Sequence, residues 1–566
     1  MKRFLVLGLI LAAGGLAAFA PPPPGAFEVR LTPSRMDAKA GRGSLDVDLR
    51  IPAADAPSGS AVLALPIVVA NVDTVAATLT GLTVRDDLGP LPLSVRDDPE
   101  ATVYLRHWIA GRAVKGALAV HYTAPVDNTP PLRGTGPPYS LRTEGGGVSG
   151  VGYSFILLPE DQRARPISLH WDLKALGPEA RGMSSFGEGD VTLAPGPVGR
   201  LGSALYMAGA MHREPTPVAA NGFSAAWLGE PPFDPKPLMV WAGKLHGWMS
   251  GFFKDTAEPP YRVILRYNPI NAGGGAAMTN SFLLTWGATA KDPEKLKGTL
   301  AHEMIHTWTA TGLGGQWYGE GIAVHYQGLL PLRAGMITPA AFLDDLNATA
   351  RRYYTNALND TPDSQVAARF WEDTRIRTLP YDRGAMYFAV LDGKIRRASG
   401  GKRSLDDLIN EMVRRRRSGG ATSEAAWLEL LDREIGADGR RLHSDMLTGR
   451  LMVPASDDFG PCFTRTTARF RRFELGFEPK SLVGNTKTIR DLQPDSEAAK
   501  AGLRNGDVVT YSVAMDSVQG DPTRMLSLQV TREGRSFSIT YLPRGDAVDA
   551  YQWARGAGVP DNRCAY

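Results

Sequence analysis

The stretch His302-Glu303-Met304-Ile305-His306 has the pattern H-E-x-x-H, and the residues around it suit a buried helix. Two histidines four positions apart lie one turn above each other on one helix face, where both can bind one metal ion. The glutamate between them lies beside the metal. Its carboxylate can take a proton from a water molecule that the metal activates. The stretch therefore predicts a zinc site, with His302 and His306 as ligands and Glu303 as the general base.

The flanking residues predict that this helix is anchored. Asp292 followed by Pro293 forms a suitable N-cap and first turn. A second face of the helix is apolar and can pack into a core, because every fourth residue is apolar: Leu296, Leu300, Met304 and Trp308. The histidine face is then free to face a cleft. The alternative is a chance arrangement of ordinary helix residues.

A catalytic zinc usually takes three protein ligands and leaves a fourth position for water. The pattern H-E-x-x-H-x-x-G-x-x-H is excluded, because Thr309 and Gly312 stand at its glycine and last histidine positions. A glutamate from the following helix is the other source, and Glu320 lies where the apolar helix within 317–326 begins. We predict Glu320 as the third ligand. A solvated carboxylate at a helix start is the alternative for Glu320. His325 is a rival ligand, although its apolar surroundings favour a packed core histidine.

Four motifs in this order resemble the glycyl aminopeptidase family of gluzincin metallopeptidases, over most of the chain. After H-E-x-x-H come W-x-x-E-G at 317–321, P-Y-x-R-G-A at 380–385, and L-D-x-x-I-R-x-x-x-G-G-x-R-S-L-D-D at 391–407. The resemblance implies a multidomain α+β protein with an N-terminal β domain, a thermolysin-like catalytic domain of two lobes and a C-terminal PDZ domain. It also implies a zinc peptidase with one zinc per chain that acts on a peptide or protein substrate.

The resemblance implies a catalytic role for Tyr381, which falls on the tyrosine that related gluzincins use to donate a hydrogen bond to the developing oxyanion. A phenol suits this role because it is a neutral donor at working pH, and its bond strengthens as negative charge accumulates. The alternative is a structural tyrosine in a proline-led turn.

The expected substrate strand departs from the family. Members commonly carry G-G-L-E-H-x-x-S there, and the matching run begins with Gly274, Gly275, Ala276 and Ala277. Ala277 replaces the glutamate with which gluzincin aminopeptidases hold the free amine of the substrate. The strand can still give main-chain hydrogen bonds to an extended peptide. The sequence therefore predicts a peptidase of aminopeptidase type and leaves open an endopeptidase that ignores the free amine.

The first twenty residues predict export. A basic start, Met1-Lys2-Arg3, leads into a short apolar stretch to Ala20, which is typical of a signal peptide over residues 1–20. This region contains no cysteine for a lipid anchor, and no later segment is apolar enough to span a membrane. We therefore expect no stable membrane anchor and a location in the bacterial periplasm or outside the cell.

Alternating apolar and polar positions predict an N-terminal β-sandwich over residues 26–200, with strands such as 61–69. Residues 201–460 then form the predicted thermolysin-like peptidase domain. A strand over 261–267 precedes the glycine-rich edge segment, and the remainder is mainly helical. This order predicts a metal site between an α/β lobe and a helical lobe.

Residues 465–550 resemble a PDZ domain. Leu475, Gly476 and Phe477 match its carboxylate-binding turn, and 496–509 matches its short helix, turn and following strand. Such a domain captures the C-terminus of a peptide ligand by adding it to a sheet edge. The alternative is that this domain only braces the catalytic unit.

The two cysteines of the chain, Cys462 and Cys564, bracket this last domain. In an oxidising compartment they can form a disulfide, which closes a loop of about a hundred residues and adds roughly 4–5 kcal/mol on the chain-entropy model. Two free thiols are the alternative.

Length and composition fit a multidomain exported enzyme. The chain has 566 residues, of which 43% are hydrophobic and 22% are charged. A net charge of +4 is too weak to indicate a nucleic-acid partner. The competing class is a binding protein in which a PDZ domain captures peptides and the metalloprotease-like body is catalytically silent. The complete set of predicted ligands, together with Glu303, favours the enzyme.

Overall fold

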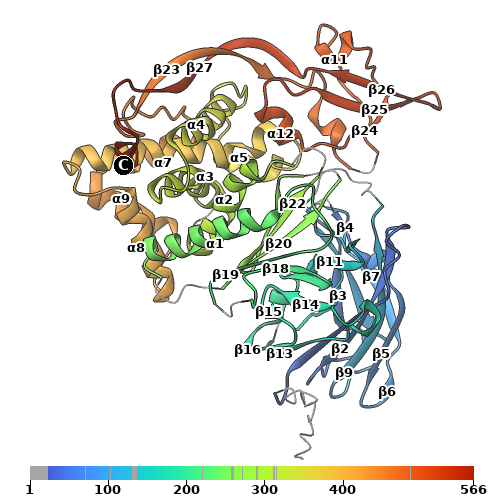
Figure 1. Ribbon diagram of the computed structural model, residues 1–566. Coiled ribbons are helices and arrows are strands. Elements are labelled where there is room, and N and C mark those ends of the chain that lie inside the picture. Colours follow the sequence, from blue (N-terminus) through green and yellow to red (C-terminus); the bar gives the residue numbers. More distant parts are fainter. Residues whose placement is uncertain are drawn as a thin grey trace, which may run out of the picture.

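The computed structural model describes residues 23–566 except 71, 102, 130–136, 162, 219–220, 256–259, 270–271, 288–290, 310–312, 314 and 485. The predicted signal peptide lies outside the described residues. The chain is a mixed α/β protein of several parts. In Figure 1 the N-terminal strands lie at the lower right, the central helices at the left, and the C-terminal domain at the top right.

Two N-terminal sheets share one apolar core. The first has the order β16-β13-β1-β2-β9-β5-β6, and the second has β12-β3-β8-β7 with β4 beside β3. Alternate residues of β1 face the core, because successive side chains of a strand point to opposite faces. The strands are β1 (Phe27–Pro33), β2 (Arg42–Ile51), β3 (Ala61–Val69), β4 (Val72–Asp73), β5 (Thr80–Asp86), β6 (Gly89–Pro90), β7 (Leu93–Asp97), β8 (Tyr104–Ala110), β9 (Leu118–Asp127), β12 (Leu158–Pro159), β13 (Ala164–Trp171) and β16 (Val191–Pro197).

A third sheet joins these strands to the central part of the chain. Its order is β10-β11-β17-β14-β15, from β10 (Arg142–Glu144), β11 (Gly147–Val151), β14 (Arg181–Ser184), β15 (Gly187–Glu188) and β17 (Leu205–Gly209). Because β17 pairs with β11 and β14, the N-terminal sheets continue to Gly209, past the predicted boundary at residue 200. Leu205 and Met207 share a core with Ile264 and Leu283 of the central sheet.

The central sheet has the order β18-β19-β20-β22-β21, with β19, β20 and β22 parallel and both edge strands antiparallel. Its strands are β18 (His212–Glu214), β19 (Phe223–Trp227), β20 (Tyr261–Tyr267), β21 (Gly275–Met278) and β22 (Ser281–Trp286). Helix α1 (Pro235–Phe252) lies between β19 and β20 in the chain, and the helices after the sheet are α2 (Lys297–Thr309), α3 (Trp317–Arg333), α4 (Pro339–Tyr354), α5 (Asp363–Arg369), α6 (Thr374–Arg377), α7 (Leu379–Ala398), α8 (Leu405–Arg417), α9 (Glu424–Ile435) and α10 (Ala437–Leu447). Strand β20 coincides with the strand predicted over 261–267.

The start of α2 follows from its N-terminal residues. The Asp292 side chain accepts a hydrogen bond from the backbone of Glu294, so it caps a 3₁₀ turn that leads directly into α2. The predicted apolar face is buried in the main core, where each of its four side chains is at most 1% exposed: Leu296, Leu300, Met304 and Trp308. This packing leaves the opposite face of α2 for the histidines.

The C-terminal domain combines a long two-stranded arm with a small sheet. Strands β23 (Phe463–Phe473) and β27 (Arg544–Arg555) form the arm, which crosses above α4 in Figure 1. The small sheet has the order β24 (Val508–Thr510), β25 (Leu526–Arg532) and β26 (Arg535–Tyr541), with helices α11 (Glu497–Lys500) and α12 (Met515–Gly520) beside it. The Asn347 side chain of α4 holds the arm through two hydrogen bonds with the backbone of Trp553, at 2.8 and 2.7 Å.

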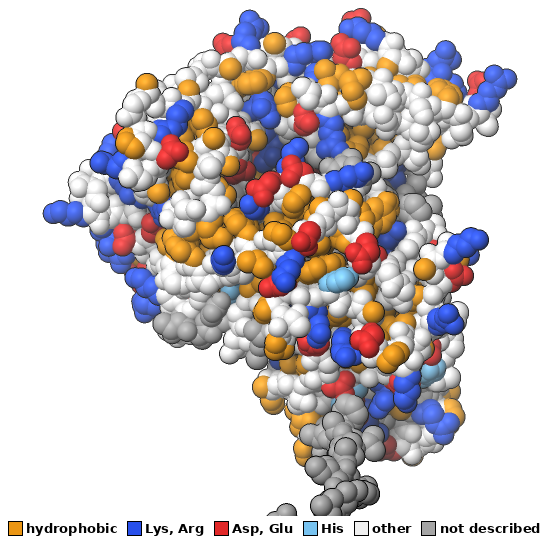
Figure 2. Space-filling model, viewed as in Figure 1, with side chains coloured by type: hydrophobic (Ala, Val, Ile, Leu, Met, Phe, Trp, Pro, Cys, Tyr) orange, Lys and Arg blue, Asp and Glu red, His pale blue; other side chains and the backbone are white. Residues whose placement is uncertain are grey.

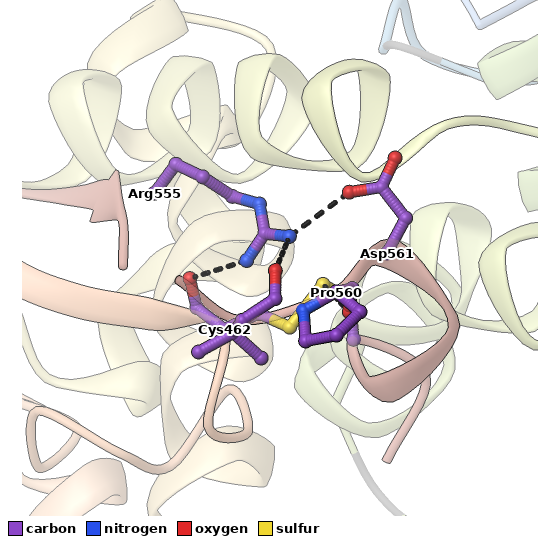
Figure 3. Close-up of a disulfide and its surroundings, with 6 residues drawn as sticks. Cys462, Arg555, Pro560 and Asp561 are labelled. Carbon is purple, nitrogen blue, oxygen red and sulfur yellow. Dashed lines mark hydrogen bonds and ion pairs between the residues drawn. A yellow bond between two sulfur atoms is a disulfide. The ribbon is translucent and has the colours of Figure 1, made fainter. Parts of the chain in front are cut away.

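A disulfide joins Cys462, just before β23, to Cys564, after β27. Figure 3 shows Arg555 above this bond, where its guanidinium donates to the carbonyl of Cys462 at 3.3 Å and pairs with Asp561 at 2.9 Å. Both half-cystines are buried. The two ends of the C-terminal domain are therefore fixed at one place.

The surface carries both signs of charge. On the face shown in Figure 2, Lys and Arg side chains lie among Asp and Glu side chains over the helices and the C-terminal domain. In the part of the chain that the structure describes, none of the helices has the length and apolarity needed to cross a bilayer.

Candidate metal and catalytic site

Helices α2 and α3 bring three metal-ligating side chains together. The Nε2 atoms of His302 and His306 are 3.3 Å apart, and Glu320 Oε2 lies 3.1 Å from the first and 3.5 Å from the second. Ligand atoms about 2.0–2.2 Å from a tetrahedral zinc lie roughly 3.4 Å from one another. The donor set and its spacing therefore fit a tetrahedral zinc. His306 and Glu320 keep 24% and 23% of their side chains exposed, which leaves one side of the site open.

A second layer of hydrogen bonds holds His302. Its Nδ1 lies 3.0 Å from Oε1 of Gln327, while Nε2 of Gln327 donates to both carboxylate oxygens of Asp345, at 2.9 and 3.1 Å. Because the amide nitrogen faces Asp345, the amide oxygen faces the imidazole, and His302 carries its proton on Nδ1. When a metal ion displaces the Nε2 proton that His302 shares with Glu320, the bond with Gln327 keeps the remaining proton on Nδ1 and leaves the Nε2 lone pair for the metal.

Hydrogen bonds also set the charge of Glu320. Burial alone would raise the pKa of Glu320, but its hydrogen bonds with His302 and His306 outweigh burial and lower the pKa below its ordinary value. Glu320 is therefore ionised at neutral pH, as a metal ligand must be.

Glu303 lies between the two histidines in sequence and lines the same cleft as His306 and Glu320. Its side chain is half-buried. Burial raises the pKa of the Glu303 carboxyl above its ordinary value, although the neighbouring imidazoles oppose the shift. A carboxyl with a raised pKa holds a proton more readily than an ordinary carboxyl, so Glu303 suits a general base.

Tyr381 enters the cleft from the first turn of α7. Its ring stacks on the imidazole of His302, with ring centroids 5.9 Å apart. Burial, together with the carboxylates of Glu320 and Glu303, raises the pKa of Tyr381 well above its ordinary value. The phenol is thus a neutral hydrogen-bond donor next to the metal ligands, which suits a developing oxyanion.

Two glycines set the separation of α3 and α7. A Cβ atom on Gly321 would lie 2.6 Å from the Cα atom of Gly384, and a Cβ atom on Gly384 would lie 2.6 Å from the carbonyl oxygen of Trp317. The backbones therefore touch where the motifs W-x-x-E-G and P-Y-x-R-G-A meet. This contact places Glu320, next to Gly321, opposite Tyr381.

The other motif residues support the site without entering it. Asp382 is fully buried and pairs with Arg352 of α4 through Nε, at 3.0 and 2.8 Å. The Asp392 carboxylate, from the fourth motif, accepts from the backbone of Leu405 at 2.7 Å and thereby ties α7 to α8. These polar groups fix the positions of the helices that carry the site.

A cleft of about 890 Å³ surrounds the site. One wall is the segment that contains Gly274, Gly275, Ala276 and Ala277. Strand β21 pairs only with β22 among the described residues, so its other edge is open to an extended peptide. Ala277 therefore gives this wall a methyl group at the position where the resemblance to the glycyl aminopeptidase family leads us to expect a glutamate.

The remaining candidate residues lie elsewhere. His325 is 7% exposed, and burial lowers its pKa to about 3, so it is a neutral core histidine and not part of the ligand cluster. Leu475 and Phe477 are buried in the core of the C-terminal domain, and Gly476 between them has φ +83°.

Sequence reasoning missed several residues of the site. Gln327 follows Glu320 by seven positions, which places both on one face of α3, and this spacing could have revealed it. Asp345 comes from α4, and Tyr139 reaches the cleft from the N-terminal part. Neither residue has a local signal, because each reaches the site only through the tertiary fold.

No protein-family model matches this chain, and no curated protein matches it. Among solved structures, an aminopeptidase N family protein from Idiomarina loihiensis matches over 94% of this chain and 98% of its own, with a TM-score of 0.65 and 16% sequence identity. An M1 zinc metallopeptidase from Deinococcus radiodurans matches over 76% of this chain and 94% of its own, with a TM-score of 0.46 and 17% identity. The chain thus shares the overall fold of the Idiomarina aminopeptidase N family protein.

Proposed function

We propose that this protein is a zinc-dependent peptidase that hydrolyses peptide bonds. The observation that carries the proposal is the trio of donor atoms on His302, His306 and Glu320, which lie 3.1–3.5 Å apart beside a cleft that Glu303 and Tyr381 line. When bound, zinc would supply Lewis-acid polarisation of the scissile carbonyl and a lowered pKa of water.

Residues of the chain perform the other roles in the reaction. Glu303 accepts the proton of the attacking water and then passes it to the leaving amine. Tyr381 donates its hydrogen bond to the oxygen of the scissile carbonyl as negative charge develops there. The open edge of β21 holds the peptide backbone in extended form. Gln327 keeps His302 in the tautomer that can bind metal.

An aminopeptidase is the finer proposal. It is supported by the four ordered motifs and by the fold shared with an aminopeptidase N family protein. A second candidate is an endopeptidase, which Ala277 favours because its methyl group cannot pair with a free amine.

For the location of this protein we propose export to the periplasm or the exterior. The sequence of residues 1–20 and the disulfide between Cys462 and Cys564 support this proposal.

The test is a chelator-sensitive cleavage assay on free and N-blocked peptides, combined with two variants. Glu303→Gln should abolish turnover and keep about one zinc per chain, and Glu320→Ala should deplete the zinc. The exposed Glu294→Gln, just before α2, is the matched control and should retain activity. Turnover by Glu303→Gln would refute the assignment. Cleavage of free peptides alone would favour the aminopeptidase, and cleavage of blocked peptides the endopeptidase.

A further inference from the structure

Helix α12 of the C-terminal domain lines the cleft that contains the candidate metal site. Ala514, Asp516 and Ser517 line the same cavity of about 890 Å³ as Glu303 and Tyr381. Although more than a hundred residues separate α12 from Tyr381 in sequence, α12 packs against α4 and α6. Figure 1 shows α12 beside the central helices. The cleft therefore has walls from the central sheet, the catalytic helices and the C-terminal domain.

Hydrogen bonds fix α12 in this place. Asp516 Oδ1 accepts from Nε and Nη2 of Arg377, at 3.1 and 2.5 Å, and from the hydroxyl of Thr374. At the other end of α12, Gln519 donates to the hydroxyl of Thr378 at 3.2 Å. These partners lie on α6 and at the start of α7, within a few residues of Tyr381. Helix α12 is thus hydrogen-bonded to the segment that leads into the first turn of α7, where Tyr381 lies.

The surface next to Leu475, Gly476 and Phe477 contacts the catalytic domain. Between the two domains lies a cavity of only about 50 Å³, whereas ligand pockets usually measure roughly 300–1,000 Å³. It is lined by Leu475, Leu482, Tyr511 and Met515 on one side, and by residues 370–374 and Arg377 on the other. The contact lies next to the turn that the sequence predicts to bind a peptide carboxylate.

The backbone of this region also disfavours capture of a separate peptide. The segment after Phe477 forms a 3₁₀ turn, Pro479–Leu482, and strand addition needs an extended edge. The carbonyl oxygen of Leu475 already accepts a hydrogen bond from Tyr541 at 2.9 Å. The position of α12 beside the cleft is therefore a better indication of the role of this domain.

We propose that the C-terminal domain is part of the substrate-binding site and that α12 selects substrates by the size and charge of the residue that contacts it. This inference rests on the proposed peptidase function. Ser517 is the position to vary, because it lines the cleft and, among the described residues, its hydroxyl donates only to the nearby carbonyl of Ala514, at 2.7 Å.

The decisive variant is Ser517→Lys, compared with Thr510→Lys on the exposed face of β24 as the matched control. The substrates are pairs of peptides that are identical except for one position, which is Glu in one peptide and Gln in the other. Each pair varies a different position of the peptide. For each pair, the measured quantity is kcat/KM for the Glu peptide divided by kcat/KM for the Gln peptide. Ser517→Lys should raise this ratio by roughly three- to tenfold at one or two positions, because the new ammonium faces the substrate. Thr510→Lys should leave every ratio unchanged. Ratios within twofold of those of the wild type at every position would overturn the proposal.

Binding measurements separate this inference from the proposed function. The same peptide pairs are bound to zinc-loaded Glu303→Gln protein, with and without Ser517→Lys. Their dissociation constants measure how α12 contributes to peptide binding, even if the protein hydrolyses no peptide. The ratio of dissociation constants should shift in the same direction. Should Ser517→Lys fail to fold, as judged by circular dichroism, Ser517→Trp replaces it. That variant should weaken binding of a ten-residue peptide relative to a tripeptide, and an unchanged ratio would overturn the proposal.

Discussion

Replacing Gln327 by leucine tests whether the second layer of hydrogen bonds controls metal affinity. The substitution removes the acceptor that lies 3.0 Å from Nδ1 of His302 and leaves Asp345 without its amide partner. His302 can then place its proton on Nε2, the atom that faces Glu320. Loss of such a bond usually weakens metal binding by about 10- to 100-fold, or roughly 1.4–2.7 kcal/mol. We expect the dissociation constant for zinc to rise by that factor.

The assay is a competition between the protein and a chromophoric chelator for zinc at fixed pH. Gln316→Leu provides a matched control on the same helix, because the Gln316 side chain is exposed and makes no capping hydrogen bond. It should bind zinc like the wild type. Asp345→Asn should have a smaller effect than Gln327→Leu, since the new amide still offers an oxygen to Gln327. A zinc affinity of Gln327→Leu within twofold of the control would refute the reasoning.

Three further predictions concern catalysis and stability. Tyr381→Phe should lower kcat by about 10²–10³ with zinc content unchanged, which steady-state kinetics and metal analysis check; an unaltered kcat would assign the tyrosine a structural role. Asp382→Asn should lower the thermal unfolding midpoint, because it leaves the Arg352 guanidinium without its buried partner at a cost of about 3 kcal/mol. Calorimetry measures this change, and an equal midpoint would contradict it. Cys462→Ser removes a cross-link between residues 102 apart, and it should destabilise the protein by roughly 4–5 kcal/mol without reductant. Reductant should abolish the difference.

The predictions that agree best with the structure rest on the spacing of histidines and apolar residues over a few turns of the chain. The four-residue spacing of His302 and His306 fixed their shared helix face, and the apolar residues on the opposite face fixed how α2 packs. The strand over 261–267 was visible because a compact apolar run between turns suits a buried strand. Glu320 was predicted beside the histidines because one of the two patterns for a third ligand was excluded and the other takes a glutamate from the following helix, and the structure brings these three residues together. These features depend on neighbours within a few turns of the chain.

Features that depend on contacts between residues far apart in the chain could not be predicted from the sequence. Residues 205–209 are assigned to the N-terminal sheets only by pairing with β11 and β14, and no residue within that strand signals those partners. The bond between Arg377 and Asp516 joins positions 139 apart. Nothing in the sequence around Asp516 indicates that it faces the cleft beside the candidate metal site, because the carboxylate resembles any acidic residue at a helix start.

The disulfide has a consequence for how the protein could be rebuilt. The Cα atoms of Cys462 and Cys564 are 5.1 Å apart, so the chain leaves the helical body and returns to it at one point. Everything between them is a side branch of the polypeptide. A linker of a few residues can span that gap, since consecutive Cα atoms lie about 3.8 Å apart. An exchange of the branch would keep the path of the chain through helices α1 to α10 continuous, but it would remove one wall of the cleft and the contacts of Trp553 and Asp516 with the helices.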